Sequence, residues 1–184
     1  MAQPQSFENA PINWIPAFVL ISTPLAALLI VPYYLWTHSV SWQVWAIFAF
    51  FMAWNGLSIT VGYHRLWSHR TYQAHPIVKW FFLIGGTLAV QGSVFDWCAG
   101  HRLHHRHVDD IYQDPYSVKR GFWFSHIGWM LKNYPSGHYD YKNIPDLKAD
   151  PVLVAQDKYY ALWILFANIG LPALFGWMVG DVIG

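Results

Sequence analysis

Histidine is the residue type whose spacing in this chain points most directly to chemistry. Seven of the ten histidines fall into two groups, and the densest run is Gly100-His101-Arg102-Leu103-His104-His105. On an α-helix, positions i, i+3 and i+4 lie within an arc of about 100°, so these three imidazoles would point to the same side. One helix could therefore supply several ligands to a metal site.

His64 and His69 belong to the other group and are five residues apart. On an α-helix this separation amounts to about 140°, so the two rings would converge if the helix ended between them and the chain bent. Imidazole suits iron, copper, nickel and zinc. Glu8 is the single glutamate, which argues against the glutamate-rich di-iron bundles and the His-Glu-x-x-His zinc proteases.

The other histidines have weaker claims to a metal. We expect His75, His107 and His126 to be structural or to contact the ligands, and His38 and His138 to be solvated. Acidic side chains near the two groups could orient the ligand imidazoles, and these are Asp96, Asp109, Asp110 and Asp114. Cys98 is the single cysteine, so an intrachain disulfide and a cysteine-based metal site are excluded.

The composition indicates that the chain lies in a membrane. Of the 184 residues, 55% are hydrophobic, 19% aromatic and 11% charged, whereas soluble domains carry about 25% charged residues. Crossing a bilayer takes about 20 residues, and three uncharged segments are long enough: Ile15 to Trp36, Trp42 to Gly62, and Tyr159 to Gly180. We therefore predict an all-α integral membrane protein, and a basic nucleic-acid-binding surface is not expected.

The link between the first two spans, residues 37–41, is short enough to make them a helical hairpin. All eleven Lys and Arg residues lie between Arg65 and Lys158, and the positive-inside rule places them in the cytoplasm. Residues 63–158 are thus predicted to form a cytoplasmic helical block that shares its side with the N-terminus. A further apolar run, Trp80 to Val90, is too short to cross, so we predict a helix over 77–98 at the membrane interface.

These motifs resemble those of the membrane fatty acyl desaturases, of the acyl-CoA or acyl-lipid delta-9 type that includes stearoyl-CoA desaturases. His64 and His69 match the first histidine box, His-x4-His, and the second box, His-x2-His-His, is matched by His101, His104 and His105. Residues 114–117 and 121–129 are also similar to family segments. The resemblance covers nearly the whole chain from the second span onward, and residues 1–184 are interpreted as one incomplete domain of this kind.

The resemblance implies an oxidoreductase of lipid biosynthesis that introduces a cis double bond into a saturated acyl chain carried by CoA or lipid. The five box histidines would bind two non-haem iron ions, with O2 as co-substrate and reduced to water. The electron donor would be similar to cytochrome b5 or ferredoxin. No catalytic residue beyond the metal ligands is expected, and Lys119 and Arg120 are candidates to meet a phosphate of the acyl carrier.

Two departures from the family pattern change these expectations. Ala99 and Gly100 stand where the animal acyl-CoA enzymes carry an Arg-Asp pair, which favours the bacterial and plant branch and a bacterial inner membrane. A third histidine box and a fourth span are missing from the sequence given. We therefore expect a truncated sequence that is inactive by itself.

Two other functions remain open. One is oxidation by another histidine-box enzyme, such as hydroxylation of an alkane, sterol or sphingolipid. The other is a non-catalytic membrane protein with a structural or sensory zinc site, which would need four ligands.

Overall fold

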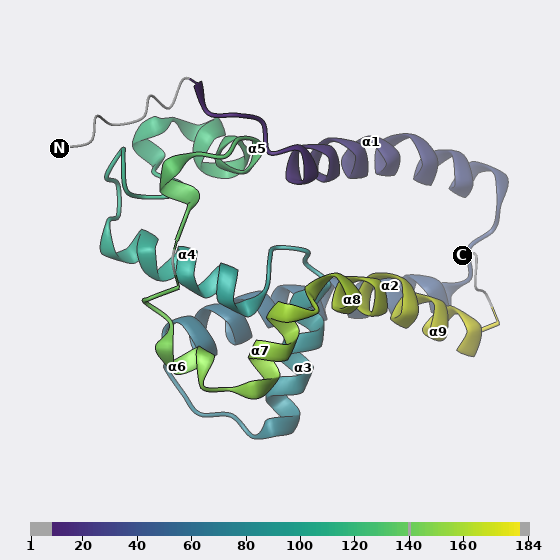
Figure 1. Cartoon of the computed structure of the whole chain (residues 1–184). Helices are drawn as coiled ribbons and strands as arrows, with labels where there is room; N and C mark the ends of the chain where they lie inside the picture. Colours follow the sequence, from purple (N-terminus) through teal and green to yellow (C-terminus); the bar gives the residue numbers. More distant parts are fainter. Residues whose placement is uncertain (1–8, 140, 181–184) are drawn as a thin grey trace. The chain divides into compact units, whose positions relative to one another are not determined.

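The computed structural model describes residues 9–139 and 141–180, in which the regular elements are helices apart from one isolated bridge between Ile12 and Lys132 (Figure 1). The chain divides into two compact units. Unit 1 combines Met1–Ser39 with Arg102–Asp140, and unit 2 combines Val40–His101 with Tyr141–Gly184. The predicted position of the N-terminus, at residues 1–8, lies outside the described residues.

Unit 1 contains the first apolar helix and a group of short helices. Helix α1, Trp14–Thr37, carries Pro24 and Pro32 in its interior. Its N-terminal end is tied to the second part of the unit, because the Asn13 amide donates to the Leu131 carbonyl at 2.9 Å. The short elements are η3 (Val118–Arg120), η4 (Phe124–Gly128), α5 (Trp129–Leu131) and η5 (Pro135–Gly137).

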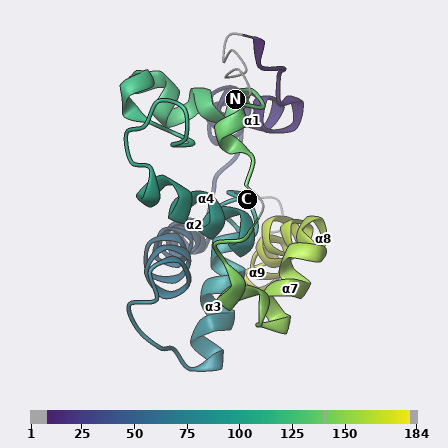
Figure 2. The same cartoon turned by 60° about the vertical axis from the view of Figure 1, so that its left-hand side comes forward.

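Unit 2 holds the remaining apolar helices and the helices that pack between them. Its elements are α2 (Trp42–Leu57), η2 (Ser58–Ser68), α3 (Pro76–Thr87), α6 (Pro145–Lys148), α7 (Pro151–Lys158), α8 (Tyr160–Leu165), η6 (Phe166–Gly170) and α9 (Leu171–Met178). Helix α4, Val94–Arg106, begins in unit 2 and runs without a break past His101 into unit 1. Figures 1 and 2 show α7 beside α3 within unit 2.

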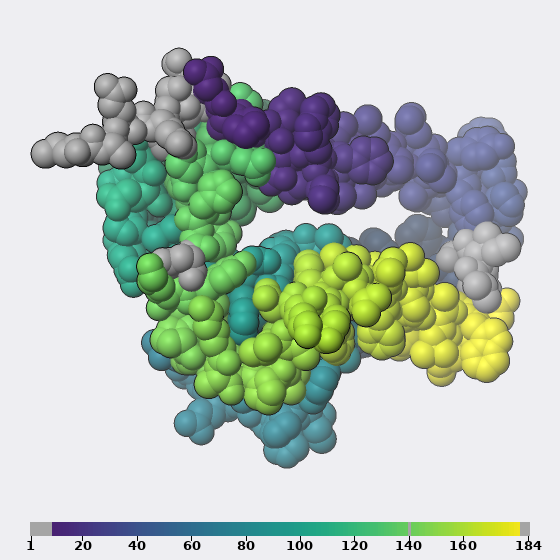
Figure 3. Space-filling view, in the orientation of Figure 1, coloured from purple at the N-terminus to yellow at the C-terminus, as the bar shows by residue number. Residues whose placement is uncertain are grey.

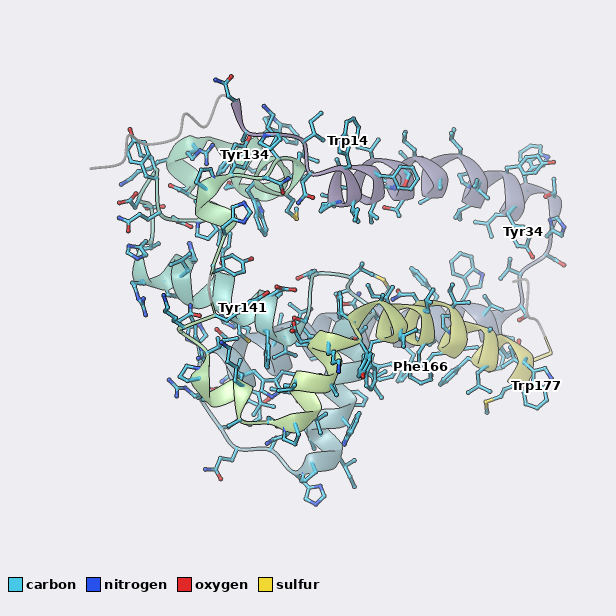
Figure 4. The ribbon with its side chains drawn as sticks, viewed as in Figure 1. Trp14, Tyr34, Tyr134, Tyr141, Phe166 and Trp177 are labelled. Carbon is cyan, nitrogen blue, oxygen red and sulfur yellow. The ribbon has the colours of Figure 1, made fainter. Side chains whose placement is uncertain are left out.

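Three helical stretches are long and apolar enough to cross a membrane: Trp14–Thr37, Trp42–Ser68 and Tyr160–Met178. They confirm the predicted number and order of spans. Their side chains are largely exposed, as Trp36 at 91% and Trp177 at 70% illustrate, and an exposed apolar surface of this length suits hydrocarbon. Residues of the third span run along the surface of unit 2 in Figure 3, and Figure 4 labels Phe166 and Trp177 on it.

Aromatic rings join the second and third spans inside unit 2. Phe175 of α9 stacks on Phe50 with ring centroids 6.0 Å apart and meets Phe51 edge-on at 5.4 Å. Trp80 of α3 lies 5.9 Å from Trp163 of α8. The Phe175 pairs hold the two spans together and the Trp80–Trp163 pair holds the third span against α3, since aromatic contacts of this geometry add to the gain from burial.

The predicted interfacial helix over 77–98 is wrong, because the structure has two helices there, α3 and α4. Residues 88–93 separate them, and Val90 and Gly92 have φ angles of 53° and 96°, which an α-helix cannot accommodate. Helix α4 then starts with reciprocal capping. The Asp96 amide donates to Ser93 Oγ at 3.1 Å, and the Ser93 amide donates to the Asp96 carboxylate at 3.4 Å, as in a capping box.

Glycines let α3 approach η2 closely. A Cβ on Gly86 would overlap the Tyr63 ring, and a Cβ on Gly62 would lie 2.6 Å from Phe82 Cβ. The side chains at this contact are buried, and Tyr63 and Thr87 have exposed fractions of 0%. The close approach of α3 therefore sets the position of the helix that carries the first two histidines.

We predict that Gly86→Ala lowers the free energy of unfolding by about 1–3 kcal/mol, the usual cost of overpacking a filled core. The measurement is denaturant unfolding in detergent micelles. Gly56→Ala is the matched control, because a Cβ there meets nothing within 4 Å and alanine favours the helix. Equal effects of the two substitutions would contradict the prediction.

Candidate metal centre

A π-helix, η2, brings the first two histidines together. Its hydrogen bonds close over five residues, including one from the His69 amide to the His64 carbonyl at 2.9 Å, so residues five apart lie about one turn apart. The two rings meet edge-to-face with centroids 4.6 Å apart. The sequence predicts that the two rings converge if the helix ends between them and the chain bends. Helix η2 does end at Ser68, between the two histidines, and its π-helical hydrogen bonds bring the rings together.

Helix α4 supplies the third imidazole. His101 Nε2 lies 3.0 Å from His69 Nε2, and its ring centroid lies 4.7 Å from that of His64. Metal–nitrogen bonds of about 2.0–2.1 Å place two ligand nitrogens of one metal roughly 3 Å apart. The spacing of these three rings is therefore suited to a shared metal ion.

His105 follows His101 by one turn of the same continuous helix, at the i+4 spacing predicted from the sequence. The ligand atoms of His64, His69, His101 and His105 all lie within 4.8 Å of one another. His64 and His101 are half-buried, and His69 and His105 are exposed. Four neutral imidazoles at this separation fit a transition-metal ion such as iron or zinc.

His104 is the predicted ligand that stands apart from this group. Its Nδ1 lies 2.8 Å from the carboxylate of Asp114, a fully buried side chain, and its ring lies 4.4 Å from that of Tyr116. A carboxylate at Nδ1 holds the proton there and makes Nε2 the donor atom for a metal. His104 as a ligand stays a prediction, and Asp114 is in position to orient it.

Asp114 itself is held by the loop around it. Its Oδ2 accepts from the Asp109 amide at 3.0 Å and its Oδ1 accepts from the Tyr116 amide at 3.1 Å. Burial raises the pKa of the Tyr116 phenol. Asp110 has another role, because its carboxylate accepts from the amides of Tyr112 and Gln113, which lower its pKa.

Trp97 is a residue of the site that sequence reasoning missed. Its ring stacks on His101 with centroids 4.7 Å apart and an angle of 26°, and it meets His64 edge-on at 6.1 Å. Its indole nitrogen donates to Gln91 Oε1 at 3.1 Å. The signal was the i, i+4 spacing of Trp97 and His101, which puts both rings on one face of a helix.

Several of the other predicted side chains have structural roles. His75 caps α3 by accepting from the Ile77 amide at 3.3 Å, and His126 Nδ1 lies 2.8 Å from the Phe122 carbonyl. His38, expected to be solvated, is exposed but stacks on Tyr34 at 4.4 Å. Asp96 accepts from the hydroxyl of Tyr141, which Figure 4 labels beside α4.

The two candidate carrier-binding residues lie in η3. Lys119 is exposed. The Arg120 guanidinium lies 3.6 Å from the centre of the Phe124 ring and 4.6 Å from that of Tyr134, and burial lowers its pKa. Contact of Lys119 and Arg120 with an acyl carrier stays a prediction.

The whole chain was compared with known protein families and with characterised proteins. The model of the fatty acid desaturase family matches residues 40–184. The chain is 34% identical over 185 residues to a probable acyl-CoA desaturase of Schizosaccharomyces pombe and 35% identical over 192 residues to acyl-CoA desaturase 1 of Saccharomyces cerevisiae. Each match covers 99% of this chain but only 38% and 36% of the relative.

A mammalian relative matches a shorter part. The stearoyl-CoA desaturase of Bos taurus is 39% identical over 148 residues, which are 79% of this chain and 40% of that protein. The chain thus spans well under half the length of each of these relatives.

We predict that the chain binds a divalent transition metal through the four imidazoles and that His69→Ala weakens this binding by at least tenfold, since it removes a ligand. The measurement is titration with cobalt(II), followed by its visible absorption. His75→Ala is the matched control, because His75 caps α3 and should leave the affinity unchanged. Equal affinities in all three proteins would contradict the assignment.

A second prediction concerns the tautomer of His104. Nitrogen-15 NMR of histidine-labelled protein should find its proton on Nδ1, and Asp114→Asn should shift the population toward Nε2–H because the carboxylate is lost. Asp110→Asn, at an exposed turn, should have no effect. An unchanged tautomer in Asp114→Asn would show that Asp114 does not orient the ring.

Proposed function

The chain belongs to the fatty acid desaturase family, and on that premise we propose that it carries metal-binding elements of a fatty acyl desaturase. The reaction would introduce a cis double bond, at the delta-9 position, into a saturated acyl chain. The observation that carries this proposal is the group of four imidazoles from the two histidine boxes, His64, His69, His101 and His105. The relatives named above, which are acyl-CoA and stearoyl-CoA desaturases, support the same chemistry.

The donor set fits iron, because neutral imidazole is a good ligand for it. When bound, a di-iron centre would supply the O2-dependent removal of one hydrogen from each of two neighbouring methylene groups. These two hydrogens, with two electrons and two protons from a donor, would reduce one O2 to two waters. The electron donor would be a small redox protein of the cytochrome b5 or ferredoxin type.

The chain's own residues position the ligands. Trp97 stacks on His101 and limits the rotation of its ring, and Asp114, 2.8 Å from His104 Nδ1, is proposed to set the tautomer of His104. Holding ligands in one geometry before substrate arrives lowers the cost of reaching the reactive arrangement. The proposed division of roles is that imidazoles bind the metals while Trp97 and Asp114 fix the rings.

The proposed substrate is an acyl chain linked to CoA, since the named relatives act on acyl-CoA. Lys119 is the exposed cation proposed to meet a carrier phosphate, with Arg120 beside it. The Ala99 carbonyl accepts from Asn143 Nδ2 at 2.8 Å, and both Ala99 and Gly100 are buried. Position 99 in this chain therefore contributes to packing instead of presenting a charge to the carrier.

The proposed location is a membrane with the histidines on the cytoplasmic side. The three apolar helices support a membrane protein, and the confinement of Lys and Arg to residues 65–158 supports the orientation. The relatives named above are eukaryotic and give no support to the predicted bacterial inner membrane.

A structural zinc site is the second candidate, since four imidazoles are the number that one zinc ion takes. Metal analysis of protein purified from cells supplied with both metals separates the two functions. Bound iron would support the desaturase. Zinc alone would support the other candidate.

We predict that this 184-residue chain alone forms no unsaturated acyl chains in cells lacking a desaturase. Two irons together take roughly nine to twelve ligand positions, and the five box histidines cannot fill them. Gas chromatography of cellular lipids provides the measurement, with a full-length relative as the positive control. Monounsaturated chains produced by this chain alone would contradict the prediction.

A further inference from the structure

A buried amide outside the histidine group connects the elements that carry it. Gln156 lies on α7, and its exposed fraction is 0%. Its Oε1 accepts from the Val94 amide at 3.0 Å. Its Nε2 donates to the Tyr63 hydroxyl at 3.0 Å and to Thr87 Oγ1 at 3.3 Å.

These three partners lie in three different elements of unit 2. Val94 is the first residue of α4, and its amide is one of those that a helix leaves without a partner of its own. Thr87 is the last residue of α3, and Tyr63 lies in η2. A carboxamide offers one acceptor and two donor hydrogens, so one side chain satisfies all three contacts.

Two of the three hydrogen-bond partners of Gln156 lie in the elements that carry the proposed metal ligands. Tyr63 immediately precedes His64 in η2, and Val94 lies about two turns before His101 in α4. The Tyr63 ring also meets the Trp97 ring edge-on at 6.2 Å, and Trp97 stacks on His101. A shift of Gln156 would therefore move both histidine-bearing elements relative to each other.

Neighbours on the same segment strengthen the connection. Ser93 Oγ donates to Asp157 Oδ1 at 2.5 Å, and the Gly92 amide donates to the Tyr160 hydroxyl at 3.1 Å. The start of α4 is thus bound to residues 156–160 at three successive positions. Since Tyr160 opens the third span, this segment joins that span to the second histidine box.

We propose that Gln156 is a positioning residue of the metal centre, which holds η2 and α4 in the register that brings His64, His69 and His101 together. The inference rests on the proposed metal-binding function. Gln156 touches no ligand imidazole and acts through Tyr63 and the N-terminus of α4. Its loss should change metal affinity and coordination geometry, whereas a merely structural residue would change stability alone.

The test compares Gln156→Met with the unchanged chain in detergent, using cobalt(II) as the probe. Methionine keeps the length of the side chain but can make none of the three hydrogen bonds. We expect cobalt affinity to fall by about 10–100-fold, as when a residue that orients ligands is lost, and the visible spectrum to change. Leu153→Met, also buried on α7, is the matched control and should leave affinity and spectrum unchanged.

Tyr63→Phe provides the test if Gln156→Met does not fold, because it removes the hydroxyl that bonds to Gln156 and Thr87 and keeps the ring on Trp97. It should bind cobalt several-fold more weakly, with helical content unchanged by circular dichroism. Native affinity and spectrum in the folded variants would overturn this inference alone, as would an equal loss in Leu153→Met. No cobalt binding by the unchanged chain would overturn the metal centre itself.

Discussion

The hydrogen bonds of η2 close over five residues, and the candidate metal centre depends on this local geometry. An α-helix over the same residues would put His64 and His69 about 140° apart. π-helical turns are rare and occur often at functional sites, so the surroundings must favour this one. The close approach of α3 does so, because Gly62 and Gly86 let Phe82 and Tyr63 pack where a larger residue would collide.

Side chains that contact the ligand rings, or the elements that carry them, fix the positions of those rings. The Trp97 ring stacks on the His101 ring, and the Asp114 carboxylate hydrogen-bonds to His104. Gln156 hydrogen-bonds to residues of both η2 and α4. An unsatisfied buried polar group would be costly, and the polar contacts of Gln156 and Asp114 are paired. The ligands can be exposed enough to receive a metal while the groups that hold them are shielded from water.

Much of this arrangement could be predicted from the sequence, because it follows from local periodicity. The uncharged runs predicted the three spans, and the i, i+4 spacing predicted that His101 and His105 share a face. The π-helix could not be predicted, since its residues have no composition that distinguishes it from an α-helix. The break between α3 and α4 had a local signal in the sequence, the capping pair of Ser93 and Asp96. The apolar residues on both sides of the break made the segment resemble one continuous helix. Gln156 depends on contacts with residues 62 to 93 positions away, which a local pattern does not contain.

We expect imidazoles of the two histidine boxes to bind the metal of a desaturase. X-ray absorption at the iron K-edge of the iron-loaded chain in detergent measures this coordination. We expect nitrogen neighbours at about 2.0–2.2 Å, with the outer-shell scattering of several imidazole rings. A shell of oxygen ligands without imidazole scattering would contradict the claim.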